Sequence, residues 1–150
     1  MNPQELIQLI TKTFEGVNLK EGIGLSQAGA IDDYETDEVN AACREKDEKE
    51  NWIRISSADL NKYYSSLSFF DAKGMRFHLP AYMIAELKGE YFFGMAFALT
   101  HLSDYPKTQF AELNLKQRQA VREFLFWLSA NEDYDYNKPH IERALRDYWI

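Results

Sequence analysis

The segment from Ser68 to Ala81 constrains the fold of this chain more than any other, because it combines a turn signal, alternating apolar residues and a proline. Asp71 and Gly74 stand three positions apart, as at the first and fourth positions of a type I turn. On either side of this turn, apolar residues alternate as they do in half-buried strands: Leu67 and Phe69 before it, and Met75, Phe77 and Leu79 after it. Pro80 favours an extended residue before it and suits the start of a helix that ends at Gly89. The segment therefore predicts a β-hairpin that leads into a helix.

Helix-start signals recur along the rest of the chain, and apolar residues at helical spacing follow them. We expect helices to begin at or just after Asn2, Ser26, Thr36, Ser56, Asn114 and Asn137. At Asn2 and Asn114, a Glu or Gln three positions further on gives the pattern of a capping box. The helix after Thr36 has only a thin apolar seam, so it is expected on the surface. Residues 52–55 predict a brief extended anchor.

The stretch from Tyr91 to Thr100 has two interpretations. Its residues alternate as in a strand, at Phe93, Met95, Phe97 and Leu99, but a buried helix would have much the same sequence. We favour a strand that pairs with the hairpin. The predicted fold class is accordingly α+β and mainly α, with helices packed around a small antiparallel β-hairpin or three-stranded sheet. No repeat or linker divides the chain, so we expect residues 1–150 to form one domain.

Composition limits the expected environment and partners. Apolar residues make up 45% of the chain, which is enough for a full core, and the single cysteine, Cys43, cannot form an internal disulfide. The N-terminus shows no secretory signal, and the longest apolar stretch, Tyr91–Leu99, is about half the ~20 residues that a membrane helix needs. We therefore expect a cytoplasmic protein that does not bind membranes. The formal net charge of -7 argues against nucleic acid as a partner.

No catalytic residue, metal site or cofactor is predicted. The three histidines are far apart and lack a zinc-type spacing: they are His78, His101 and His140. The residues around Ser26 lack the second glycine of a nucleophile elbow, so this serine is interpreted as a helix cap. Cys43 lies on an apolar helix seam, where a small buried residue belongs. The glycines form neither a phosphate loop nor a dinucleotide fingerprint.

One candidate ligand site lies in the predicted hairpin. Arg76 and His78 are two residues apart, so on an extended segment their side chains share a face, and Asp71 lies at the turn. An arginine beside a histidine and a carboxylate can bind an anion or a substrate carboxylate. The alternative is structural: Asp71 would bond the amides of the turn, and Arg76 would pair with a nearby acid.

Acidic residues gather in two further segments. Residues 32–50 contain nine acids and three bases, a local balance of -6. Residues 132–136 interleave acids with tyrosines, which offer contact area at low entropic cost. Because acids attract a cationic partner, the sequence predicts partner-binding residues in both segments. They are Asp32, Asp33, Asp37, Glu38, Glu45, Asp133, Tyr134 and Tyr136. The alternative is a solvated helix face and a polar loop.

The run Leu67–Tyr82 resembles the signature of a family of small bacterial proteins of unknown function. In this chain the signature reads Ser-Phe-Phe-Asp-Ala-Lys-Gly-Met-Arg-Phe-His-Leu-Pro-Ala. The likeness extends to four more segments: Gly22–Leu25, Ala30–Tyr34, Phe97–Thr100 and Gln117–Leu128. The resemblance implies a bacterial source and a shared fold, and it transfers no catalytic residue because the family has no settled activity.

Two hypotheses for the function follow. The first is a small acidic protein that binds and neutralises a basic protein, as an immunity or inhibitor protein does. The second is a small enzyme or ligand-binding domain with its site at Asp71, Arg76 and His78. The sequence leaves the partner, any substrate and the oligomeric state undetermined.

Overall fold

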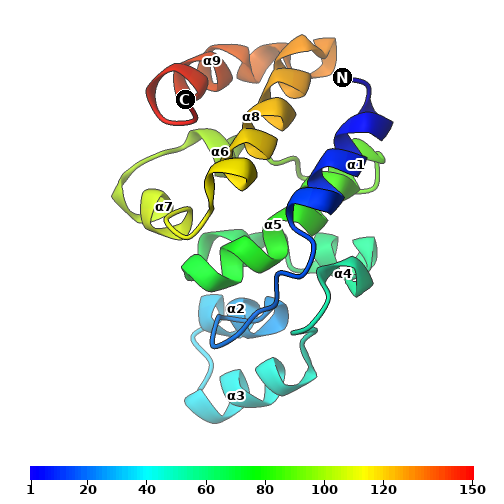
Figure 1. Ribbon diagram of the computed structural model, residues 1–150. Helices are drawn as coiled ribbons and strands as arrows, with labels where there is room; N and C mark the ends of the chain where they lie inside the picture. Colours follow the sequence, from blue (N-terminus) through cyan, green and yellow to red (C-terminus); the bar gives the residue numbers. More distant parts are fainter.

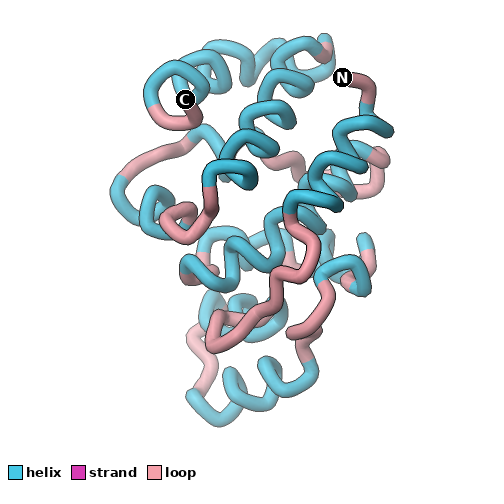
Figure 2. Tube along the Cα trace, in the orientation of Figure 1, coloured by secondary structure: helices cyan, strands magenta, loops and turns pink.

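The computed structural model describes residues 1–150 and consists of helices and the loops between them, with no strand (Figure 2). In chain order the elements are α1 (Pro3–Thr13), α2 (Leu25–Asp32), α3 (Asp37–Lys46), the 3-10 helix η1 (Trp52–Arg54), α4 (Ser57–Lys62), η2 (Tyr64–Ser68), α5 (Ala72–Leu87), α6 (Ala96–Thr100), α7 (Asp104–Gln109), α8 (Leu115–Ala130), η3 (Glu132–Asn137) and α9 (Lys138–Asp147). In Figure 1, α5 crosses the middle of the molecule, α2 and α3 lie at one end, and α9 lies at the other.

Polar side chains cap four helices where the sequence predicts their starts. Asn2 accepts a hydrogen bond from the backbone N–H of Glu5 at 2.8 Å, and Asn114 caps α8 by an equivalent bond. Thr36 and Ser56 cap α3 and α4 in the same way. These four starts are confirmed, and each cap satisfies a backbone donor that the first helical turn leaves free.

Three smaller expectations differ from the structure. Helix α2 begins one residue before Ser26, whose hydroxyl bonds Asp47 at 2.6 Å instead of capping the helix. Asn137 precedes α9 as expected, but its side chain makes no capping hydrogen bond. Residues 52–54 are not extended, because they form η1, with Trp52 buried in the core; only Ile55, which ends this helix, has extended backbone.

The predicted β-hairpin is wrong, and with it the α+β fold class, because the segment is helical and α5 runs through it. Asp71 is the N-cap of α5 and accepts a hydrogen bond from the N–H of Gly74 at 2.8 Å. The spacing that suggests a turn is therefore the spacing of a helix cap. Twelve of the 16 residues of α5 are buried. A helix that is buried on every side shows no polar stripe, so a stretch of it can imitate the alternation of a strand.

Pro80 lies inside α5 and does not begin it. It has no N–H to donate to the carbonyl of Arg76, so one hydrogen bond of the helix is missing there. The side chains on both sides of the proline are packed in the core, which supports the helix across this gap. The predicted end of the helix is confirmed, since Gly89 follows it with a φ of 73°, in the left-handed region that glycine favours.

The strand that we favoured at Tyr91–Thr100 is also wrong. Its first half forms a loop, and α6 occupies the second half. Polar side chains satisfy the main chain of this loop: the Glu86 carboxylate accepts the N–H of Met95 at 2.7 Å, and the Asn61 side chain accepts that of Phe92 at 2.9 Å. The loop therefore needs no partner strand.

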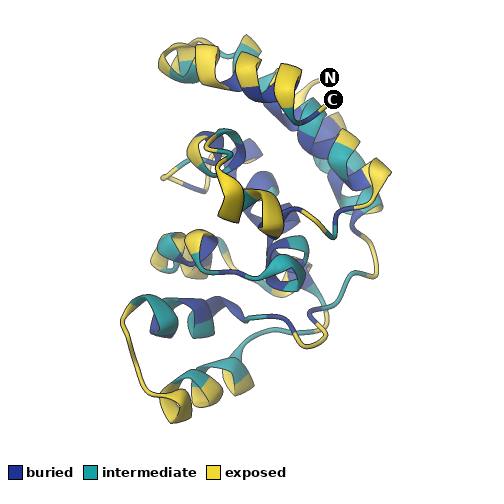
Figure 3. Ribbon diagram, turned by 90° about the vertical axis from the view of Figure 1, so that its left-hand side faces the viewer, coloured by how far each residue is buried: buried dark blue, intermediate teal, exposed yellow.

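The core lies between α1, α5, α8 and α9, whose buried side chains belong to one apolar cluster. The predicted inward face of α8 is confirmed, with Val121, Phe124, Leu125 and Leu128 all buried. Figure 3 shows the contrast with α3, which lies at the far end and buries none of its residues. Every helix falls short of the length and apolar character that a membrane-spanning segment requires.

Candidate functional site

Residues 32–50 form one end of the molecule, which we call the acidic end. Helix α3 is a surface helix, as predicted, and polar contacts hold it to the body. The Arg44 guanidinium donates to the carbonyl oxygens of Gly22 and Lys20, at 3.0 and 2.6 Å. Because little apolar area is buried here, hydrogen bonds decide how α3 sits on its neighbours.

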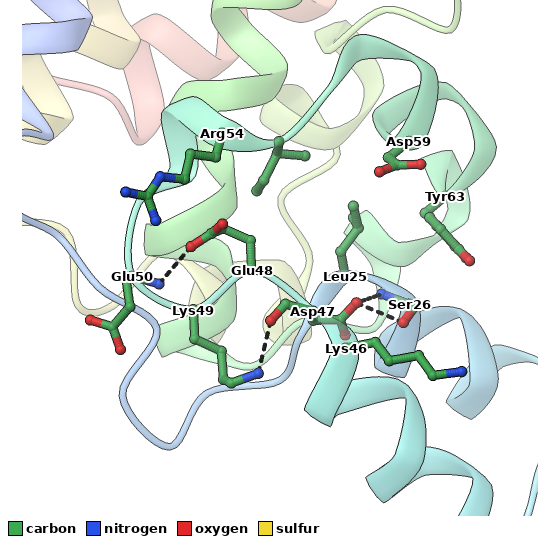
Figure 4. Close-up of a pocket in the computed structure, with 11 residues that line it drawn as sticks. Leu25, Ser26, Lys46, Asp47, Glu48, Lys49, Glu50, Arg54, Asp59 and Tyr63 are labelled. Carbon is green, nitrogen blue, oxygen red and sulfur yellow. Dashed lines mark hydrogen bonds between the residues drawn. The ribbon is translucent and has the colours of Figure 1, made fainter.

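Asp47, just after α3, joins this helix to α2 (Figure 4). Its carboxylate accepts the backbone N–H groups of Ser26 and Gln27, both at 3.0 Å. The N-cap of α2 is Gly24, which has no side chain with which to accept these bonds. Asp47 therefore caps α2 from a distant part of the sequence, and its negative charge is favourable at a helix N-terminus.

The Lys49 ammonium binds carbonyl oxygens rather than carboxylates. It donates three hydrogen bonds of 2.8–3.0 Å at the end of α3, to the carbonyls of Arg44, Glu45 and Asp47. A cation is favourable at this position, since the carbonyls at a helix C-terminus carry partial negative charge. Lys49 and Arg44 thus stabilise the main chain, and neither of them forms an ion pair with a carboxylate of the segment.

Most carboxylates of the acidic end are open to solvent. Asp33, Asp37, Glu38 and Glu45 are exposed, and Asp32 is half-buried. The protein contains two ion pairs closer than 4.0 Å, and both lie elsewhere in the chain. No direct ion pair therefore neutralises the negative charge of the acidic end.

An exposed tyrosine lies among these acids. Tyr34 follows α2, between Asp33 and Glu35, and 96% of its surface is exposed. Its φ of 57° is in the left-handed region, which is uncommon for a residue other than glycine and unfavourable for a bulky one. This conformation closes the C-terminus of α2, because the Glu35 N–H donates to the carbonyl of Ala30 at 3.0 Å and the Tyr34 N–H to that of Ile31 at 3.1 Å, as in a Schellman cap.

A polar pocket of about 530 Å3 lies beside Asp47 (Figure 4). The charged residues that line it are of both signs: Asp47, Glu48, Glu50 and Asp59 against Lys46, Lys49 and Arg54. The Glu48 carboxylate is used by the main chain, since it accepts the N–H groups of Glu50 and Asn51, both at 3.1 Å. With its charges nearly balanced, the pocket favours neither an anion nor a cation, and we assign no site to it.

The second acidic segment, in η3, lies between α8 and α9, at the opposite end of the molecule from α3 (Figure 1). Asp133 and Tyr136 are exposed, whereas Tyr134 is half-buried and its hydroxyl donates to the Glu86 carboxylate at 2.6 Å. Burial raises the pKa of Glu86 above its ordinary value. The structure therefore separates the two acidic segments, and Tyr134 helps to attach η3 to α5.

The candidate ligand site at Asp71, Arg76 and His78 does not form an open site. Asp71 caps α5 and also accepts the backbone N–H of Ile23 at 3.0 Å. Arg76 and His78 do not share a face, because two residues on a helix are about 200° apart. His78 has no exposed surface, and the main pockets are lined by other residues.

The His78 imidazole is part of the core. It stacks on Phe70 with 4.3 Å between ring centroids, and its Nδ1 lies 2.6 Å from the carbonyl oxygen of Gly74. Burial lowers the pKa of His78 to about 4, so the ring is neutral at pH 7 and Nδ1 carries the proton that it donates. Its Nε2 has no hydrogen-bond partner.

An aromatic groove is the feature that the sequence analysis missed. It has a volume of about 450 Å3 and lies between η2, the loop after α5, α6 and α7. Tyr64 and Phe93 stack on one part of it, with 3.9 Å between ring centroids, and Phe97 stacks on His101 at 4.3 Å. In the sequence, Phe93 and Phe97 belong to the alternation that suggests a strand, so the pattern does not indicate that they line a groove. The run of aromatic residues at positions 91–93 was the available signal.

The structure contains no candidate metal site. No cluster of three or more histidine, cysteine or acidic side chains has a geometry that could hold a metal ion. Cys43 is half-buried and lines a cleft together with Ser26 and Gly29 of α2.

Comparison with known families gives a match over nearly the whole chain. A family model described as "Family of unknown function (DUF6714)" matches residues 2–150. This confirms the predicted relationship to an uncharacterised family. No match was found among curated proteins or among solved structures.

Proposed function

The chain belongs to the family of unknown function DUF6714, and from that premise we propose that it is a binding protein for a basic protein partner. The acidic end contacts the partner, and the interaction neutralises or regulates it, as an immunity or inhibitor protein does. Charge complementarity of this kind raises the rate of association and excludes acidic proteins.

The observation that carries this proposal is the state of the carboxylates at the acidic end. Most of them are exposed, and none is in an ion pair with a lysine or arginine of the same chain. Arg44 and Lys49, the bases best placed to pair with them, bind main-chain carbonyls instead. A cationic partner therefore meets negative charge without first having to displace an internal partner.

Tyr34 supports the same proposal. An exposed tyrosine between two acids offers a ring that can contact a lysine or arginine of the partner, while the acids attract the charge. Tyrosine is also one of the residues that contribute most to binding energy at protein interfaces.

The test compares two variants with the same change in charge. One carries Asp33→Asn, Asp37→Asn and Glu38→Gln at the acidic end. The other carries Glu132→Gln, Asp133→Asn and Asp135→Asn in η3, at the opposite end of the molecule. Each variant and the unmodified protein are used to capture partners from cells of the source organism, at about 0.05 M and about 0.5 M salt. Captured proteins are identified by mass spectrometry, and the interaction is then measured with purified partner.

We expect a basic partner whose affinity falls about tenfold or more with the acidic-end variant and little with the η3 variant. Its affinity also falls as salt is added, because salt screens the attraction between exposed charges. Equal losses for the two variants would mean that only net charge matters. A purified partner that binds the acidic-end variant as tightly as the unmodified protein would refute the proposal.

A further inference from the structure

Exposed aromatic side chains gather at the aromatic groove. Phe93 is 55% exposed and Phe97 is 68% exposed, and Tyr64 and Tyr105, which also line the groove, are about half exposed. Large apolar side chains that are exposed together, rather than singly, mark binding surfaces. The volume of about 450 Å3 suits one or two bulky side chains of a partner.

The walls of the groove are held in place before any partner binds. The Glu86 carboxylate accepts the N–H of Met95, and Asn61 accepts that of Phe92, on either side of Phe93. The Gln109 amide, from α7, donates to the carbonyl oxygens of Leu67 in η2 and of Phe70 after it, both at 2.9 Å. A groove ordered in this way loses little conformational entropy on binding.

No lysine, arginine, aspartate or glutamate lines the groove, but the groove adjoins a charged cleft. Ser65 lines both the groove and a second cleft of about 440 Å3 that belongs to the acidic end. Asp32, Asp33 and Glu35 line that cleft, and Lys62 is the one base beside them. The Lys62 ammonium lies over the ring of Tyr63, 5.3 Å from its centroid, and no ion pair joins it to these acids. The negative cleft and the aromatic groove thus adjoin at Ser65.

From this continuity we infer that the groove and the cleft together bind one segment of the basic partner, an extended peptide with basic side chains in the cleft and an aromatic or branched aliphatic anchor in the groove. The inference rests on the proposed function and adds to it the place and the chemistry of recognition. The cleft and the groove contribute different interactions to binding. The acids attract the cationic residues, and the aromatic walls provide the apolar contact that a charged surface alone lacks.

Charge selects this occupant over others. An acidic peptide would be repelled by the three carboxylates of the cleft, and a purely apolar peptide would leave the cleft unused. A basic peptide without an anchor would leave the exposed rings of Phe93 and Phe97 in water. Only a segment with both features satisfies both halves of the surface.

The experiment uses the full chain and three acetylated and amidated peptides. The test peptide is Arg-Lys-Gly-Trp-Leu, and two relatives lack one feature each: Glu-Asp-Gly-Trp-Leu lacks the basic residues, and Arg-Lys-Gly-Ser-Asn lacks the anchor. Binding is followed by NMR titration of the amide and aromatic signals of the protein. We expect the test peptide to shift the signals of Phe93, Phe97 and Asp33 together, and to bind about tenfold or more tightly than either relative. Equal binding of the three peptides, or shifts confined to other surfaces, would overturn the inference.

Protein variants provide the second arm. Phe93→Ala and Phe97→Ala remove exposed rings and are expected to weaken binding of the test peptide about tenfold. Phe126→Ala is the matched control, since Phe126 is a similarly exposed aromatic residue on α8 that does not line the groove. Circular dichroism checks that each variant keeps the helical fold. Loss of binding in the Phe126 variant to the same degree would overturn the inference.

The outcomes separate this inference from the proposed function. If the basic partner is lost with the acidic-end variant but binds the Phe93 and Phe97 variants normally, the inference fails and the proposed function stands. If the test peptide needs the groove but no basic protein depends on the acidic end, the proposed function fails and the groove is a peptide site of another kind. Loss of the partner with both sets of variants supports both.

Discussion

His78 is a titratable residue that the fold uses as an apolar one. It stacks on Phe70, and its Nδ1 bonds the carbonyl of Gly74 one turn earlier in α5. Burial lowers the pKa of this imidazole from 6.5 to about 4. The native state therefore resists protonation in a pH range where the unfolded chain takes up a proton, and this difference links stability to pH.

Acidification is expected to destabilise the protein through His78. Since the pKa is lower in the folded state than in the unfolded one, the contribution is complete above about pH 6.5 and is lost as the pH falls toward 4. The loss amounts to about 3 kcal/mol in the free energy of unfolding. Urea unfolding of the protein and of a His78→Phe variant, between pH 7 and 4, measures it.

The comparison with the variant is needed because Glu86 acts in the opposite sense. Because the pKa of Glu86 is raised in the folded state, Glu86 makes the stability fall as the pH rises. The His78→Phe variant retains Glu86 and therefore retains this effect. The difference between the two pH profiles therefore isolates His78. Parallel profiles would show that His78 does not titrate differently in the folded state.

Gly74 is a helical glycine that no other residue can easily replace. A Cβ atom added to it would lie 2.6 Å from the carbonyl oxygen of Ile23 and 2.9 Å from the Asp71 carboxylate. The preceding loop residue, Gly22, also lies close to Gly74, since its own added Cβ would lie 2.8 Å from the Gly74 nitrogen. The loop before α2 thus packs directly on the main chain of α5.

A Gly74→Ala variant is expected to be less stable by about 1–3 kcal/mol, because the methyl group would push against backbone that cannot move independently. Without this contact, the same change inside a helix would stabilise by about 0.5–1 kcal/mol. The midpoint of urea unfolding gives the sign. Gly29→Ala in α2 is the control, since its added Cβ would meet the Tyr63 ring at 3.1 Å, and a ring can shift. A more stable Gly74→Ala variant would contradict the observed packing.

At the scale of elements, α3 is held to α2 by polar contacts, whereas α2 itself contributes Leu25 and Ala28 to the apolar core. Helix α3 buries no residue. Asp47 bonds α2, and Arg44 bonds the loop that precedes α2. Segments with few buried apolar contacts open more easily than core helices. The element that carries the acidic end is therefore expected to be the first to open.

Asp47→Ala is expected to destabilise α2 and α3 by about 1–2 kcal/mol, because it removes the cap of α2 and its bond to the Ser26 hydroxyl. Hydrogen exchange should show faster exchange of the Ser26 and Gln27 amides, with the amides of α8 unchanged. Asp47→Asn keeps one acceptor oxygen, so its stability should lie between that of the unmodified protein and that of the Asp47→Ala variant. Unchanged protection of these two amides would mean that the cap does not hold α2.

At the scale of the whole molecule, the two acidic segments are separated by the core. Asp47 ties together the acidic end, and Tyr134 attaches η3 to Glu86 at the opposite end (Figure 1). The two bonds share no partner. Their effects on stability are therefore expected to be independent.

A double variant tests this independence. The losses of unfolding free energy caused by Asp47→Ala and by Tyr134→Phe are expected to add to within about 0.5 kcal/mol when both are combined. Chemical unfolding of the two single variants and the double variant measures the sum. A coupling of more than about 1 kcal/mol would show that the two ends do not behave as separate regions.

The sequence by itself determined the features of this protein that depend on local interactions, namely where helices begin and which helix faces are buried. Asn2, Thr36, Ser56 and Asn114 cap helices within three residues of themselves, so their role can be inferred without knowing the rest of the fold. The exposed character of α3 and the buried stripe of α8 follow from periodicity in the same way.

Only the tertiary structure decided the rest, because long-range contacts set it. Burial of most of α5 removed the periodicity that distinguishes a helix from a strand, so the pattern around Asp71, Arg76 and His78 predicts a hairpin instead. Asp47 caps a helix that lies 20 residues before it, and Ser65 joins a groove to a cleft built from distant segments. Neighbours along the chain determine how a helix begins and ends, but the side that a residue presents to a partner depends on everything packed against the other sides.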